Sequence, residues 1–81
     1  MSATVRIPLP DALLLRSKDR KSLEARSRLF LALKFFELGE LSAGQAGGMC
    51  GMSRVAFLFE AGRNGVPVAD LSDEELENEF E

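Results

Sequence analysis

The sequence predicts a mainly helical domain that opens with a short β-strand, contains a helix-turn-helix and ends in an acidic helix or tail. Strong helix formers fill residues 22–38. Gly39 follows them at the position where a residue in the left-handed conformation commonly ends an α-helix. Ser42 and Ser53 each have the position of an N-cap ahead of a further helix. Apolar and other residues alternate over residues 4–9, which is the pattern of a strand.

The N-terminal strand places Val5, Ile7 and Leu9 on one face. Pro8 has no backbone N–H to give to a ladder, so this strand belongs at an edge or an end. Its pairing partner is either the segment 66–68 or a second copy of the chain. A brief helical turn over residues 12–15 and a charged loop over 16–21 follow.

The long helix over residues 22–38 is the strongest helix signal in the chain. It carries an apolar stripe at helical spacing, and further apolar residues occupy much of the remaining circumference. The stripe is Leu29, Ala32, Leu33 and Phe36, and the others are Phe30, Leu31 and Phe35. A helix that is apolar nearly all round must be covered on more than one side. We therefore expect this helix, with Leu29, Phe30, Leu33 and Phe36, to form the core or the interface of a homodimer.

Two short helices joined by a glycine turn predict a helix-turn-helix over about residues 42–62. Ser42 and Gln45 form a capping box, and Gly51 ends the first helix. Ser53 caps the second helix, which runs to about Gly62. Small or apolar residues stand where the two helices would touch: Ala46, Gly47, Cys50, Gly51, Met52 and Phe57. Cys50 in this pattern is a small core residue rather than a reactive thiol.

The composition excludes several functional classes. The chain has 81 residues, no His and one Cys, so Ser-His and Cys-His nucleophile systems, His-rich metal sites and a disulfide framework are excluded. No run of residues is apolar and long enough for a membrane span, and the N-terminus lacks the features of a signal peptide. The sequence therefore predicts a cytoplasmic protein that is not an enzyme and takes no cofactor or metal.

The charges are distributed asymmetrically. Residues 1–34 contain eight Lys and Arg against three Asp and Glu, whereas residues 70–81 contain seven acids and no base. This asymmetry favours two different partners, or a tail that folds back on the basic front. Solvated surface at both ends is the simpler alternative.

The helix-turn-helix offers few groups for reading DNA. Ser53 and Arg54 begin its second helix, Arg63 could reach a phosphate, and Arg6 points away from the apolar face of the strand. The neighbouring apolar residues of the second helix are Val55, Leu58 and Phe59. An apolar outer face favours a protein partner, so both kinds of contact remain open.

The sequence divides into a strand and helix-turn-helix domain over residues 1–69 and an acidic partner-binding segment over residues 70–81. The acidic segment has a second helix-start signal. Ser72 and Glu75 form a capping box, and the segment offers apolar anchors for a basic protein partner at Leu71, Leu76 and Phe80. Its acids lack the loop of fixed oxygen ligands that a calcium site needs, so no metal site is expected.

The run Gly51-Met52-Ser53-Arg54, followed by Asn64-Gly65-Val66-Pro67-Val68 and an acidic tail, resembles uncharacterised protein family 0175. The similarity covers roughly residues 29–76. The resemblance implies a small prokaryotic antitoxin-like protein whose partner toxin is often a PIN-domain ribonuclease. It also implies that Ser53 and Arg54 begin a DNA-recognition helix, and that residues 66–80, with Val66 and Val68 at their start, face the toxin. Gly47-Gly48 and Glu60 depart from the family pattern.

We therefore expect an antitoxin of a type II toxin–antitoxin pair that neutralises a ribonuclease toxin through residues 70–81. Binding of operator DNA through residues 42–62 is its second expected activity. Two alternatives stay open: a stand-alone DNA-binding transcriptional regulator, and an adaptor that binds protein without touching DNA.

Overall fold

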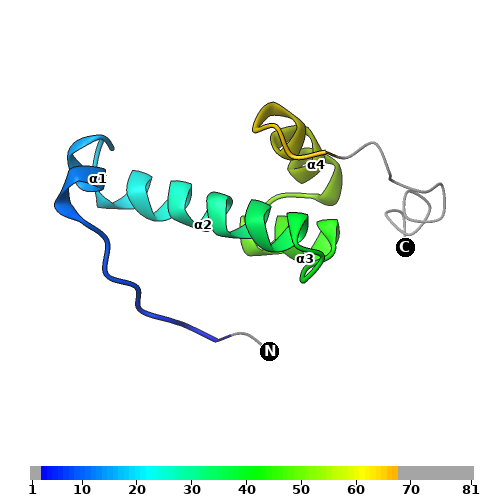
Figure 1. The fold of residues 1–81 in the computed structure, drawn as a ribbon, viewed down its shortest axis with the longest axis horizontal. Helices are drawn as coiled ribbons and strands as arrows, with labels where there is room; N and C mark the ends of the chain where they lie inside the picture. The colour runs from blue at the N-terminus through cyan, green and yellow to red at the C-terminus, as the bar shows by residue number, and fades with distance from the viewer. Residues whose placement is uncertain (1–2, 68–81) are drawn as a thin grey trace.

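The computed structural model describes residues 3–67 and shows four α-helices in this part of the chain (Figure 1). They are α1 (Asp11–Leu15), α2 (Arg20–Glu37), α3 (Ala43–Met49) and α4 (Arg54–Arg63). Helix α2 forms the long axis, with α1 at one end and the α3–α4 pair at the other. The mainly helical class is thus confirmed. The predicted acidic helix over residues 70–81, and the boundary at residue 70, lie outside the described residues.

Helix α2 starts two residues earlier than the sequence indicates, because Asp19 caps it. The Asp19 side chain accepts a hydrogen bond from the Ser22 N–H at 2.8 Å. The predicted loop is therefore shorter, and Arg20 and Lys21 are helical. The expected stop is confirmed at the other end, where Gly39 has φ +79°.

The predicted N-terminal strand is absent from the described part of this single chain. Residues 3–10 precede α1 as an arm that stands clear of the helices (Figure 1). Outside the helices, the backbone hydrogen bonds of the described residues begin only with the Leu13 N–H, which donates to the Pro10 carbonyl. A strand needs a neighbour for its hydrogen bonds. The segment near Val66 cannot serve, because Val66 bonds instead to Ala61 at the end of α4.

The core is small and is built mainly of alanines around one phenylalanine. Phe57 is fully buried and meets the Phe36 ring edge-on, with the ring centroids 5.4 Å apart and the planes at 89°. Small side chains let helices α2, α3 and α4 approach one another closely. The complete set of buried apolar residues in the described part is Ala32, Leu33, Ala43, Ala46, Phe57, Ala61 and Val66.

No helix in residues 3–67 combines the length and the apolar character that crossing a membrane requires.

Candidate nucleic-acid and partner interface

Helix α3 begins with the capping box that the sequence predicts. The Gln45 N–H donates to Ser42 Oγ at 3.1 Å, and the Ser42 N–H donates to Gln45 Oε1 at 3.0 Å. Both bonds satisfy amides that the first turn of a helix leaves without partners. The start of the helix-turn-helix is therefore fixed locally, independently of packing.

A tight four-residue turn over residues 50–53 joins α3 to α4. Gly51 has φ +70°, and the Gly47 carbonyl accepts hydrogen bonds from the N–H groups of Cys50 at 2.9 Å and Met52 at 2.8 Å. The turn folds so closely onto Gly47 that a Cβ there would lie 3.0 Å from the carbonyl oxygens of Met52 and Ser53. Gly47 is therefore the position that lets the turn and α4 pack onto α3.

Helix α4 presents one side to the core and another to the outside. Phe57 and Ala61 are buried, and Leu58 is partly buried against the same cluster. Leu58 thus faces inward more than the sequence indicates. Val55 and Phe59, which are four residues apart and share a helix face, remain exposed. This outward face is apolar, so it can contact a protein or the hydrophobic edge of a base.

The four predicted DNA contacts do not form one basic surface in the single chain. Ser53 is exposed, but its Oγ already accepts the Ala56 N–H at 3.1 Å as the cap of α4. Arg54 and Arg63 are nine residues apart, which places them on roughly opposite faces of an α-helix. Arg63 pairs with Glu60 at 2.9 Å. Arg6 lies on the N-terminal arm, on the other side of α2 from α4 (Figure 1).

The residues predicted for the core or dimer interface separate into two groups. Leu33 is buried, and Leu29 and Phe36 pack partly buried against the core of the same chain. Phe30 remains exposed, and the Arg26 guanidinium lies 5.7 Å from its ring centroid. Of this predicted set, Phe30 has the most surface left for a partner.

The residues predicted to contact a toxin begin at Val66, which the structure places in the core. Its N–H donates to the Ala61 carbonyl at 2.9 Å, and its side chain is buried. Val66 therefore anchors the chain where it leaves α4. The other predicted contacts, Val68, Leu71, Leu76 and Phe80, lie outside the described residues.

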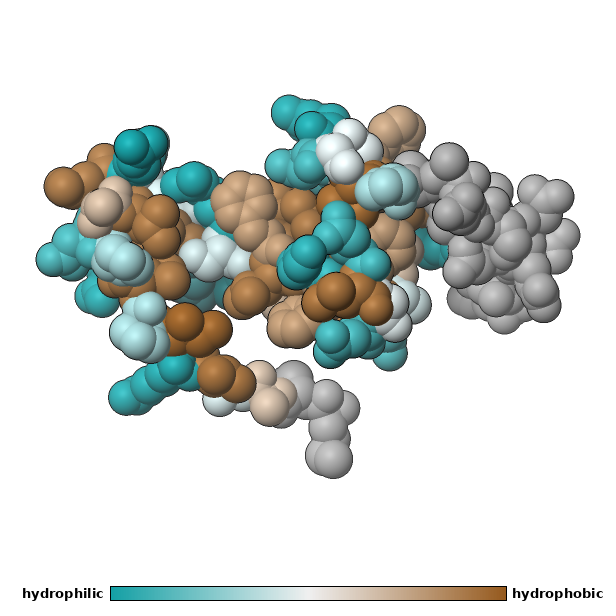
Figure 2. All heavy atoms as spheres, in the orientation of Figure 1, coloured by the Kyte–Doolittle hydropathy of each residue, from teal (hydrophilic) through white to brown (hydrophobic). Residues whose placement is uncertain are grey.

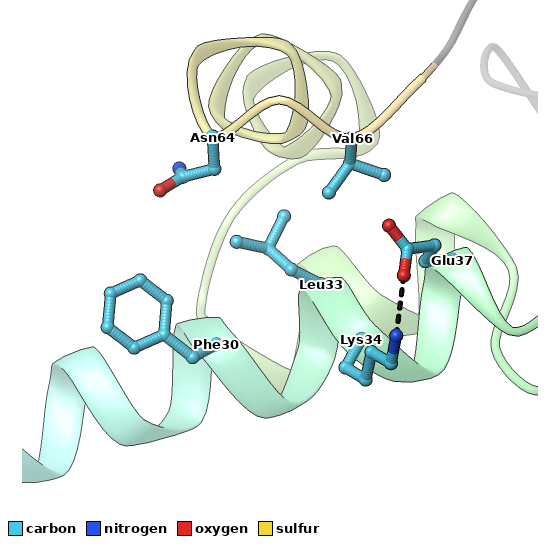
Figure 3. A pocket seen from close by; sticks show the side chains of 6 residues that line it. All are labelled: Phe30, Leu33, Lys34, Glu37, Asn64 and Val66. Carbon is cyan, nitrogen blue, oxygen red and sulfur yellow. Dashed lines mark hydrogen bonds and ion pairs between the residues drawn. The ribbon is translucent and has the colours of Figure 1, made fainter.

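A shallow, open hollow of about 250 Å³ lies between α2 and the end of α4 (Figure 3). Apolar side chains form its floor, and the Lys34–Glu37 ion pair, at 2.7 Å, lies on its rim. Its lining residues are Phe30, Leu33, Lys34, Glu37, Asn64 and Val66. The hollow has the size to take an apolar side chain, so it suits contact with another chain.

Asn64 is a structural residue that the sequence interpretation uses only as a helix breaker. Its Nδ2 donates to the Glu60 carbonyl at 2.7 Å, which also accepts the Asn64 backbone N–H at 3.0 Å, so Asn64 closes the end of α4 with two hydrogen bonds. Gly65 follows with φ +79°. The Asn-Gly pair is the signal that points to this role, since both residues favour the end of a helix.

Cys50, which the sequence predicts as a small core residue, lies partly buried at the edge of the core. Its Sγ donates to the Arg28 carbonyl at 3.8 Å, and it packs partly buried beside the core. Burial raises the pKa of this thiol, and the nearby Arg28 guanidinium opposes the rise. A raised pKa keeps the thiol neutral and unreactive near neutral pH.

We expect Cys50 to react with iodoacetamide more slowly in the folded protein than in urea at the same pH. Because the folded state raises the pKa of this thiol, it holds the thiol proton more tightly than the unfolded chain does. The associated stability is present below the ordinary pKa of a thiol and is lost as pH rises through the higher pKa of the folded state. In Cys50→Ala, the free energy of unfolding should therefore fall less at alkaline pH than in the wild type. Equal alkylation rates in both states would contradict this account.

In the described residues, fold and site together define a small helical protein whose α3–turn–α4 unit is a helix-turn-helix with an exposed apolar face on α4. The profile of the uncharacterised protein family UPF0175 matches residues 1–81, and the chain belongs to this family. A "UPF0175 protein" of Aeropyrum pernix is 42% identical to it over 59 residues. That match covers 73% of this chain and spans 65% of the relative's length. No solved structure matches the chain.

Proposed function

We propose that this protein is a cytoplasmic antitoxin of a type II toxin–antitoxin pair, acting by binding rather than by catalysis. It neutralises a PIN-type ribonuclease through residues 70–81 and binds operator DNA through α3 and α4. The observation that carries the proposal is the α3–turn–α4 unit, in which one side of α4 completes the core and the other stays exposed.

The acidic composition of residues 70–81 supports the toxin-binding part of the proposal. A ribonuclease binds an anionic substrate, so its active-site surface attracts a segment that carries seven acids and no base. Leu71, Leu76 and Phe80 add apolar contacts to this attraction. Val66, which is buried in the core, fixes the chain where it leaves α4 and leads toward this segment.

The start of α4 supports the DNA-binding part. Arg54 is the first residue of α4 and Ser53 caps it. Residues at the N-terminus of a recognition helix are the ones that reach base edges and phosphates in helix-turn-helix proteins. Arg63 contributes less, because it is the last residue of α4 and lies at the far end of the helix from Arg54.

The test of toxin binding is co-expression with a PIN-type toxin encoded beside the gene. We expect the full chain to co-purify with the toxin and to inhibit its ribonuclease activity. A chain lacking residues 70–81 should lose both properties. A second variant with Leu71, Leu76 and Phe80 changed to Ala keeps every charge, so it separates apolar anchoring from charge. Unchanged toxin affinity after the deletion would refute toxin docking and leave a stand-alone regulator.

DNA binding is tested by retention of the DNA upstream of the gene over a series of salt concentrations. Log K falls as log salt rises, and each phosphate contact makes this negative slope steeper by about 0.9. We expect Arg54→Gln to weaken DNA binding and to reduce the magnitude of that slope by about one. Arg63→Gln should have a smaller effect on both. Binding that ignores salt, or is absent, would refute the DNA-binding part.

A protein-binding adaptor is the second candidate, and the exposed Phe59 and Val55 on α4 favour it. An exposed aromatic side chain is a common anchor of a protein interface. If Phe59→Ser abolishes co-purification of a partner protein while DNA retention is absent in the wild type, the adaptor is the correct function.

A further inference from the structure

The N-terminal arm, residues 3–9, has the properties of a strand without a partner. Val5, Ile7 and Leu9 are 74%, 54% and 41% exposed, although they are the apolar residues of the segment. Within residues 3–67, the backbone of this arm makes no hydrogen bond to the rest of the chain. Figure 2 shows apolar residues along the arm, which stands clear of the helices. Within residues 3–67, nothing pairs with the backbone of this arm or covers its apolar face.

The positions of the two prolines show which edge of the arm can pair. Along a strand, the N–H and C=O groups of successive residues point to opposite edges. Pro8 and Pro10 both have even numbers, so the missing donors all belong to one edge. The other edge, formed by the backbones of Val5, Ile7 and Leu9, keeps every N–H. One edge is thus blocked and one is complete.

We propose that the complete edge pairs with the same edge of a second copy, forming an antiparallel two-stranded ribbon with Ile7 at its two-fold axis. Ile7 of each copy exchanges N–H to C=O bonds with Ile7 of the other. Val5 of each copy exchanges the same bonds with Leu9 of the other. This inference is independent of the proposed function, since a ribbon dimer can form whether or not the protein binds a toxin or DNA.

Side-chain chemistry selects this register. It sets Val5 opposite Leu9 and Ile7 opposite Ile7, so the three apolar side chains pair only with one another. Arg6 then lies opposite Pro8 of the second copy. The register shifted to centre on Arg6 would set two arginines directly opposite, which is unfavourable. Pro8 falls at a non-hydrogen-bonded position, where its missing N–H costs nothing.

A ribbon of two strands is marginal in water and needs a hydrophobic surface to cover its apolar face. Helix α2 offers one. Leu31, Phe35 and Leu38 are exposed and lie at i, i+4 and i+7, so they form a single stripe. Leu31 is about 160° around the helix from the buried Leu33, and the three residues of the stripe keep 37%, 37% and 56% of their surface exposed. The apolar face of the ribbon, with three side chains from each copy, matches this stripe.

Two proline substitutions test the ribbon through its edge. Ile7→Pro removes the donor at the two-fold axis, whereas Arg6→Pro removes a donor from the edge that Pro8 already blocks. By sedimentation, we expect the wild type and Arg6→Pro to dimerise alike. Ile7→Pro should dimerise roughly 10- to 100-fold more weakly, because two symmetry-related hydrogen bonds are lost. Both sites precede α1 and are exposed, so helical circular dichroism should be unchanged in both variants.

Amide hydrogen exchange in the wild-type dimer gives the independent readout. The N–H groups of Val5, Ile7 and Leu9 should be protected, and those of Thr4 and Arg6 should exchange freely. A protein that stays monomeric at hundreds of micromolar, a dimer equally stable in Ile7→Pro, or protection of the even-numbered amides would each overturn the ribbon. A dimer with unprotected arm amides would place the interface elsewhere and would also overturn it.

Discussion

Phe57→Ala should destabilise the protein by about 3–5 kcal/mol, the range measured when a buried phenylalanine is truncated. Phe57 is 0% exposed and is the largest fully buried side chain in the described part of the chain. Its ring also makes the edge-on contact with Phe36 that joins α4 to α2. Small domains have only about 5–15 kcal/mol of total stability. The variant should therefore be largely unfolded at temperatures where the wild type is folded, which urea denaturation followed by circular dichroism will measure.

Phe59→Ala is the matched control, because it removes the same side chain two residues away on the same helix. Phe59 is 70% exposed and is not part of the core cluster. We expect its effect on the free energy of unfolding to stay within about 0.5 kcal/mol. If the two variants were equally unstable, α4 would pack with a different face inward. A dimer that buries Phe59 would show itself as a concentration dependence of the Phe59→Ala effect.

Local hydrogen bonding explains why the helix starts could be predicted from the sequence. Ser42 and Ser53 cap helices through contacts with residues only three positions away. Such contacts leave a readable spacing in the sequence. The same rule covers Asp19, which accepts the Ser22 N–H. Its acidic side chain sits among charged residues that are typical of a loop, and this is why the sequence misplaces the start of α2.

The parts that could not be predicted depend on contacts between distant residues. The N-terminal arm has the alternation of a strand, but strand formation depends on a neighbour that residues 10–67 do not supply. Val66 lies in a motif that the family resemblance assigns to the toxin, yet its side chain packs into the core with Leu33, more than thirty residues away. The spacing of residues in the sequence does not show whether such a residue packs into the core or contacts another protein.

The candidate site was predictable in its position and only partly in its chemistry. The helix-turn-helix falls where its caps and glycines place it, with α3 and α4 inside the expected range except for the last residue of α4. The direction in which each cation points was not predictable from composition. Arg63 is engaged by Glu60, where the family resemblance implies an apolar residue. That departure affects the surface more than the core, because Glu60 is only partly buried.

Gly47→Ala and Gly48→Ala should have opposite effects on stability, although they are neighbours in α3 and both break the helix-forming pattern. A Cβ at Gly47 would lie 3.0 Å from two backbone carbonyl oxygens and 3.3 Å from Phe57 Cβ, and backbone cannot move aside cheaply. We expect Gly47→Ala to cost about 1–3 kcal/mol, as overpacking does. At Gly48 a Cβ meets nothing within 4 Å, so Ala should stabilise the helix by up to about 1 kcal/mol. Urea denaturation of the two variants measures both effects. If Gly47→Ala proved neutral or stabilising, the turn would not pack on α3 as described, and the α3–turn–α4 unit would lose the close contact that positions α4.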